Sequence, residues 1–166
     1  MQTMHVVGGD PGLVHSGALR LVFRPDDKEI YVESEAIDGP DAYAFGQWVR
    51  SNNLGIGVLP EPYIWIEGYK PRSHYSTDHR MTEAVTNFQR ETRGTVLLNT
   101  GVKKTIKRPL MELLGCWAFT TTTHHQDLRS AARIALYGMV KNDTLNQVLY
   151  SVVRDHLEGR TWHVHQ

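Results

Sequence analysis

Short apolar segments with a two-residue period dominate the first part of the chain. Residues 4–7 are mostly apolar and predict a buried strand that ends at Asp10. Gly17–Phe23 and Glu29–Ser34 alternate between apolar and polar positions, which is typical of half-buried strands. The gaps between the three segments are too short for a crossover helix, and residues 25–28 have turn chemistry. We therefore predict an antiparallel three-strand meander.

Helical and strand periods alternate over the next part of the sequence. A helix is predicted after Gly39-Pro40-Asp41, because Ala42, Phe45 and Val49 follow at helical spacing. Tyr63–Glu67 and Thr95–Leu98 are strongly apolar and predict two further buried strands. The stripe from Met81 to Phe88 predicts a helix between them, so these two strands should be parallel with a right-handed crossover.

The last part of the chain reads as helices followed by a short tail. Pro109 opens a short helix to Leu114, and a longer apolar stripe runs from Leu128 to Val140. A final helix is predicted from about Thr144, and residues 161–166 are expected to fray. The whole pattern predicts an α/β fold with a five-stranded mixed sheet, made of the meander plus two parallel strands and flanked by helices on both faces.

Composition limits the class of protein. The 166 residues suit one domain, 1–166, and 40% hydrophobic with 22% charged residues is ordinary for a soluble protein. No apolar stretch approaches the roughly 20 residues that span a bilayer, and the N-terminus lacks the pattern of a signal peptide. The single cysteine, Cys116, excludes an internal disulfide and fits a reducing compartment. We expect a cytoplasmic protein that does not bind membranes.

Charge is unevenly distributed along a chain whose net charge is zero. Residues 1–62 hold 4 Lys/Arg against 9 Asp/Glu, whereas residues 63–140 hold 11 against 6. The remaining residues, 141–166, hold 3 of each. An asymmetry of this kind is compatible with a basic face that a neutral total hides, although solvated helix faces produce it too.

Two acidic residues occupy equivalent places in the pattern. Asp10 and Glu67 each end a buried apolar strand, and neighbouring parallel strands would bring the two carboxylates together. Like charges at short range repel unless a cation lies between them, so such a pair would suit a divalent metal ion. Taken singly, each acid is better explained as a solvated strand end, since acids are mostly exposed.

A third group of residues, 123–127, shifts the interpretation towards a metal site. Thr123 and Gln126 fit a capping box, which would place His124 and Asp127 one turn apart on the same face of a helix. Oxygen and nitrogen ligands of this kind suit Mg²⁺ or Mn²⁺. The alternative for Asp127 is a surface acid that the helix dipole favours in a first turn. The small residues that follow, Ala131, Ala132 and Ala135, would let this helix approach the sheet closely.

These motifs, in this order, resemble the RuvC-like Holliday junction resolvases. The opening strand and turn, Gly9-Asp10-Pro11-Gly12 with Ser16-Gly17, is similar to the first motif of that family. The strand ending in Ile66-Glu67 and the acid-led, Ala-rich segment Asp127–Gly138 match two later motifs. Gln89 with Arg93-Gly94 also resembles the family's helix end before its next strand. The likeness covers nearly the whole chain, including its spacing.

The resemblance implies an RNase H-like fold and a four-member metal site of Asp10, Glu67, His124 and Asp127. In this family two divalent ions, Mg²⁺ or Mn²⁺, are expected per active site, with Asp10 bridging them. Many members carry an acid where His124 stands, and some carry His. The site here has three carboxylates and one imidazole, and His124 is expected either to ligate a metal or to help activate water.

The resemblance also implies contacts to DNA. The family's aromatic wedge lies three positions after the strand glutamate, where this chain has Lys70, and Tyr69 lies one residue earlier. Phosphate contacts require cations rather than a particular sequence. The basic candidates for these contacts are Lys70, Arg72, Arg80, Lys103, Lys104, Lys107 and Arg108. A solvated basic turn explains the 103–108 cluster equally well.

The expected activity is the resolution of four-way DNA junctions in recombination and repair. Two symmetric metal-dependent nicks would leave 5′-phosphate and 3′-hydroxyl ends, and a two-fold homodimer would supply both active sites. The stripe from Met81 to Phe88 is either part of that dimer interface or ordinary core. The expected partners are branched DNA and a second copy of the chain, in a bacterial cell or a phage-infected host. The sequence specifies no branch-migration helicase.

Other functions remain open at this stage. A broader endonuclease for forks and flaps would keep the same chemistry, and a junction-binding protein without activity would result if His124 disables the site. Gly8, Gly9 and Gly12 loosely resemble a phosphate-binding loop, but a strand rather than a helix follows them. Nine histidines invite a zinc site, which the lack of Cys/His ligand spacing disfavours.

Overall fold

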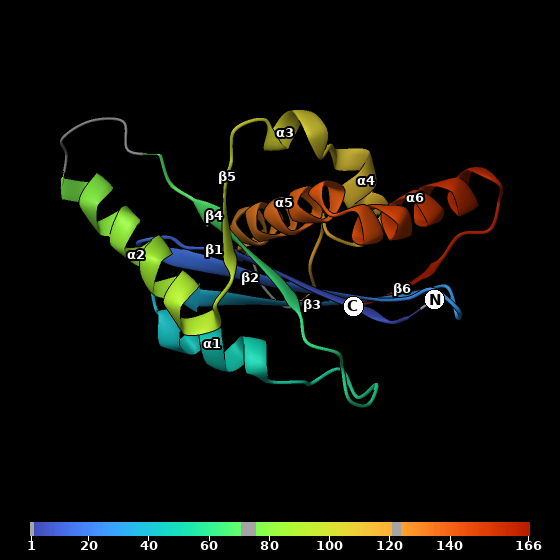
Figure 1. Cartoon of the computed structure of the whole chain (residues 1–166), viewed down its shortest axis with the longest axis horizontal. Helices are drawn as coiled ribbons and strands as arrows, with labels where there is room; N and C mark the ends of the chain where they lie inside the picture. The colour runs from blue at the N-terminus through green and yellow to red at the C-terminus, as the bar shows by residue number, and fades with distance from the viewer. Residues whose placement is uncertain (1, 71–75, 121–123) are drawn as a thin grey trace.

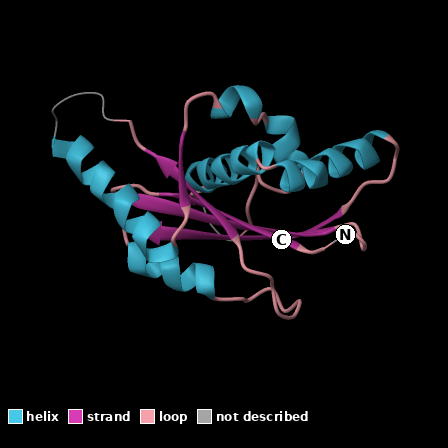
Figure 2. Ribbon diagram, viewed as in Figure 1, coloured by secondary structure: helices cyan, strands magenta, loops and turns pink. Residues whose placement is uncertain are grey.

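A computed structural model describes residues 2–70, 76–120 and 124–166 of the chain. One mixed sheet with helices on both faces forms the molecule (Figures 1 and 2). The strands are β1 Met4–Asp10, β2 His15–Arg24, β3 Glu29–Asp38, β4 Tyr63–Gly68, β5 Thr95–Leu98 and β6 His163–His165. The helices are α1 Ala42–Arg50, α2 Ser76–Thr92, α3 Val102–Thr105, α4 Arg108–Leu113, α5 His125–Lys141 and α6 Asp143–Leu157.

The sheet order is β5-β4-β1-β2-β3-β6. The pairs β1–β2 and β2–β3 are antiparallel, and β1–β4 and β4–β5 are parallel. This confirms the predicted meander, the two parallel strands and the helices on both faces. The α1 helix starts as predicted, because the Asp41 side chain caps it by accepting a hydrogen bond from the backbone N–H of Ala44.

The prediction of five strands and a frayed tail was wrong. Residues His163–His165 form a sixth strand, β6, which pairs in parallel with β3. The buried indole of Trp162 holds the tail in place, since its N–H donates to the Asp155 carboxylate at 2.9 Å. The backbone N–H of His163 also donates to the Lys28 carbonyl. A tail fixed by packing and hydrogen bonds does not fray.

Two apolar cores lie on opposite faces of the sheet. The larger core packs α5 against the sheet, together with α3, α4 and α6, and the smaller one packs α1 and α2 (Figure 1). Ala84, Val85 and Phe88 of α2 are buried, Val85 and Phe88 within the smaller core. The apolar stripe of α2 is therefore core in this chain, and it leaves little apolar surface for an interface. None of the described helices combines the length and hydrophobicity needed to span a lipid bilayer.

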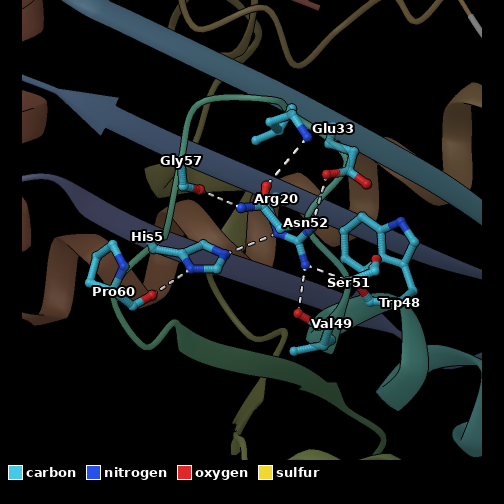
Figure 3. A network of polar contacts seen from close by, with 10 residues as sticks. His5, Arg20, Glu33, Trp48, Val49, Ser51, Asn52, Gly57 and Pro60 are labelled. Carbon is cyan, nitrogen blue, oxygen red and sulfur yellow. Dashed lines mark hydrogen bonds and ion pairs between the residues drawn. The ribbon is translucent and has the colours of Figure 1, made fainter.

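A fully buried arginine of β2 ties the β-sheet to the end of α1 (Figure 3). The Arg20 guanidinium donates to the Glu33 carboxylate at 2.8 Å and to the carbonyls of Trp48 and Val49 at 3.0 and 2.7 Å. Its Nε donates to Nε2 of His5 at 3.0 Å. A buried cation is tolerated because every side of it meets an acceptor.

Candidate active site

The pairing of β1 with β4 brings Asp10 and Glu67 together. The register pairs Gly9 of β1 with Ile66 of β4, and one more residue along each strand reaches the two acids. The Glu67 carboxyl lies close enough to that of Asp10 to help raise the pKa of Asp10. Both acids therefore lie at the same end of the two central parallel strands, as the sequence predicted.

Helix α5 delivers the third acid, Asp127, to the same place. The backbone of Asp127 lies directly on Gly17, which is the β2 partner of Asp10. A Cβ atom at Gly17 would come within 2.3 Å of the Asp127 carbonyl oxygen, and one at Gly8 within 2.0 Å of the Ala131 carbonyl oxygen. Contacts that short do not occur, so α5 can lie this close to the sheet only because both positions are glycine.

Asp10 responds to its two acidic neighbours. The pKa of Asp10 is raised well above its usual range, first by desolvation, then by the hydrogen bond with Glu67 and by the charges of Glu67 and Asp127. A crowded, half-buried carboxyl of this kind holds a proton more strongly than an isolated one. A divalent cation would replace that proton as the counter-charge.

The donor chemistry of this cluster fits a hard divalent ion. Carboxylate oxygens are the ligands that Mg²⁺ and Mn²⁺ prefer, and Asp10, Glu67 and Asp127 supply them from two strands and a helix. As the side chains stand, no group of three or more His, Cys, Asp or Glu residues among those described is arranged to hold a metal ion. The support for a metal site is thus the kind of donors present and the raised pKa of Asp10.

His124 stands at the edge of the cluster, but not where the sequence placed it. It is the N-cap of α5 and makes no side-chain capping bond, so the predicted capping box was wrong about the start of the helix. Thr123, its proposed cap, lies outside the described residues. The His124 ring packs against the His15 ring with centroids 4.1 Å apart and the ring planes tilted by 39°, and His15 Nδ1 lies 3.6 Å from the Asp38 carboxylate. The sequence analysis did not identify His15.

The candidate DNA-contacting residues after β4 differ in their exposure to solvent. Lys70 is exposed directly beyond β4, and Arg80 is exposed on α2. Tyr69 is partly buried against the smaller core. Arg72 lies outside the described residues, so the structure says nothing of its place.

The basic run 103–108 forms α3 and the start of α4. Lys103, Lys104 and Lys107 are exposed and form no ion pair within the described part of the chain. Arg108 differs, because its guanidinium is paired with Glu112 and lies 4.5 Å from the centre of the Trp117 ring. The three lysines are therefore better placed than Arg108 to meet phosphate.

Two arginines that the sequence analysis missed extend this basic face. Arg129 and Arg133, both on α5, lie with Cζ 3.9 and 5.8 Å from the centre of the Trp117 ring. Arg129 also donates to the Trp117 carbonyl at 2.6 Å. Their four-residue spacing on one helix, after Asp127, was the available signal, since such residues share a helix face.

Comparison with known proteins identifies the fold. No protein-family model and no curated protein sequence matches the chain. Thermus thermophilus RuvC in complex with a Holliday junction substrate superposes with a TM-score of 0.54 at 16% identity, covering 89% of this chain and 95% of that one. A second structure of Thermus thermophilus RuvC gives a TM-score of 0.46 at 17% identity over the same shares of the two chains.

A third solved structure is the nuclease domain of the large terminase g2p from bacteriophage SPP1, with bound Mn. Its TM-score is 0.37 at 12% identity, covering 81% of this chain and 86% of that domain. The likeness to the RuvC–junction complex shows that this chain has the RuvC fold, as its motifs predicted. Identity this low leaves activity to be argued from the site itself.

Proposed function

We propose that this chain is a divalent-metal-dependent endonuclease that cuts branched DNA, and four-way junctions in particular. The observation that carries the proposal is the convergence of Asp10, Glu67 and Asp127 at one sheet end, with His124 beside them. These acids come from three separate elements. The paired strands β1 and β4 hold Asp10 and Glu67 side by side, and α5 carries Asp127. An acidic cluster built in this way next to a basic face suits the hydrolysis of phosphodiesters.

Each residue has a definite part in this proposal. Asp10, Glu67 and Asp127, with His124 as a further ligand or proton acceptor, would hold Mg²⁺ or Mn²⁺, two ions per site. When bound, such ions lower the pKa of water and stabilise a departing oxygen, so hydrolysis would leave 5′-phosphate and 3′-hydroxyl ends. His124, at the N-terminal end of α5, would exchange a proton with solvent in the second of these roles. Asp10 would present its carboxyl from the end of the central strand β1.

The choice of substrate has separate support. The RuvC structure whose fold this chain shares is in complex with a Holliday junction substrate. The cations that the sequence offers would hold the phosphates of such a junction, with Tyr69 against the bases. They are Lys70, Arg72, Arg80, Lys103, Lys104, Lys107 and Arg108. Two symmetric nicks require two active sites, which a homodimer would provide. We place this activity in recombination and repair of DNA in the cytoplasm.

Cleavage of a synthetic four-way junction tests the proposal. The full chain is incubated with the junction in Mg²⁺ or Mn²⁺ and in EDTA, beside Asp10→Asn and, as a matched control, Asp26→Asn in an exposed turn. We expect paired symmetric nicks from the wild type and Asp26→Asn, none in EDTA, and none from Asp10→Asn, which should still bind the junction. Undiminished cutting by Asp10→Asn would refute the assignment of the site.

The same assay separates the two alternatives. Equal rates on forks, flaps and four-way junctions would indicate a broader branched-DNA endonuclease. Tight junction binding with no cutting in any metal would indicate a binding protein without activity. Thermal unfolding of each variant accompanies the assay, so that a loss of activity is not confused with a loss of folding.

A further inference from the structure

A pocket of about 330 Å³ opens beside Glu67. Its walls come from the end of β4, the segment after β5, α3 and the middle of α5, which Figure 1 shows meeting at one end of the sheet. That volume lies at the small end of the range for ligand sites, so it has room for one small unit and not for a duplex. The pocket adjoins the proposed cutting site and shares one acid with it, Glu67.

The walls combine cations with an apolar surface. Lys103, Lys104 and Arg133 line the pocket and outnumber its single acid, Glu67. Ile134 supplies apolar wall and is almost fully buried. Phosphate requires cations, whereas a base requires a flat apolar surface. A nucleotide is the chemical unit that satisfies both kinds of wall.

Arg133 carries a hydrogen-bonding group in need of a partner. Its Nε is buried and has no hydrogen-bond partner in the part of the chain that the structure describes. A buried N–H without an acceptor costs free energy, which a bound anion would recover. The centre of the Trp117 ring lies 5.8 Å from the Arg133 Cζ, and Arg129 donates to the Trp117 main-chain carbonyl.

We propose that this pocket takes the nucleotide adjacent to the scissile phosphate in the cut strand. Arg133, with Lys103 and Lys104, binds the phosphate of that nucleotide, and its sugar and base lie against the wall that contains Ile134. The inference rests on the proposed nuclease function, and it adds a positioning role for Arg133. Holding the neighbouring nucleotide would fix the scissile phosphate over Asp10 and Glu67.

Methylphosphonates, which are uncharged analogues of the backbone phosphates, provide the test. Each phosphate within four nucleotides of the cut is replaced in turn by a methylphosphonate, and junction affinity is measured in Ca²⁺ for the wild type, Arg133→Ala and Lys141→Ala. Lys141 lies at the C-terminal end of α5, and its replacement by alanine removes the same charge as Arg133→Ala. We expect one position next to the cut to cost the wild type and Lys141→Ala about tenfold in affinity. Arg133→Ala should lose less than about twofold there.

Abasic sites placed in turn along the same strand test whether a base binds in the pocket. An abasic site at the coupled position should lower wild-type affinity, while abasic sites two or more nucleotides away should have little effect. Equal methylphosphonate costs in wild type and Arg133→Ala at every position would overturn the inference. In that case a wild type that still cuts junctions leaves the proposed function intact. A wild type that neither cuts nor binds junctions would instead refute the proposed function.

Discussion

At the scale of single residues, hydrogen bonding imposes one protonation state on His5. Its Nε2 accepts from the buried Arg20, so the proton must lie on Nδ1, which donates to the Pro60 carbonyl at 2.8 Å (Figure 3). The pKa of His5 is lowered, mainly by burial and further by the charge of Arg20, although the Pro60 hydrogen bond opposes the change. A proton on Nε2 would point at the guanidinium and break the link between β1 and β2.

The first prediction concerns stability in mild acid. Above the unfolded pKa of about 6.5 both states of His5 are neutral and its contribution is complete. As pH falls below that value, the unfolded state takes up a proton before the folded state does, so the free energy of unfolding decreases. We expect the wild type to lose up to about 1.4 kcal/mol per pH unit relative to His5→Gln within that window. Urea unfolding between about pH 7.5 and 5.5 measures the difference.

His5→Gln is a suitable reference because its amide can still accept from Arg20 and donate to Pro60, yet does not titrate. Taking the difference between the two proteins removes the other eight histidines from the comparison. Parallel pH profiles for the two proteins would mean that His5 does not control this loss.

The sequence predicted where some residues of the candidate site lie, but not others. Asp10 and Glu67 could be placed because each follows an apolar strand, and strand ends are fixed by a simple period. Arg129 and Arg133 share a helix face by their spacing, but that spacing is uninformative until Trp117 is found beside them. His15 gains interest only through its contact with the His124 ring. Contacts between distant segments are what a single sequence does not contain.

At the scale of elements, the approach of α5 to the sheet depends on residues without side chains. Gly17→Ala would drive its new Cβ into the backbone of Asp127, which has no rotamer to yield. Gly138→Ala would meet the Trp65 ring at 2.1 Å, about three turns further along the same helix. Both substitutions overpack the interface, but only the first displaces an acid of the candidate site.

We therefore predict different outcomes for the two variants. Each should lose about 1–3 kcal/mol of stability by overpacking. Only Gly17→Ala should also lower the cutting rate per folded molecule, by at least about tenfold, since a small misplacement of a catalytic group has a large effect on rate. Single-turnover junction cleavage, corrected for the folded fraction, makes the comparison. Equal rates in both variants would show that the position of α5 at Gly17 does not limit activity.

Elements differed in how far the sequence predicted them. The meander and the parallel pair follow from apolar periods within each segment, and they were found. The three-residue β6 has no period to detect, and its place depends on Trp162 and Asp155, which meet only in the folded chain. The start of α5 was misplaced for a similar reason, because the capping pattern at Thr123 is local and the seat of the helix on Gly17 is not.

At the scale of the whole molecule, the charge asymmetry along the chain becomes an asymmetry in space. The basic middle region runs from β4 to α5, and it includes the strand that ends near Glu67 and the helix that carries Asp127. The exposed lysines of this region, Lys103, Lys104 and Lys107, face solvent without ion pairs among the described residues. Such an arrangement attracts a polyanion to the acids, which on their own would repel it.

The last prediction uses salt to distinguish this function from simple solubility. Replacing Lys103, Lys104 and Lys107 with alanine should weaken junction binding, and should reduce the slope of log affinity against log salt by about 0.9 for each phosphate that is no longer neutralised. The control replaces Arg90, Lys141 and Arg154, which lie on α2, α5 and α6 and change the net charge equally. Because counterion release depends on the phosphates bound and not on total charge, the control should keep the wild-type slope. Equal slopes in all three proteins would indicate that the basic run 103–108 is a solvated turn that does not bind phosphate.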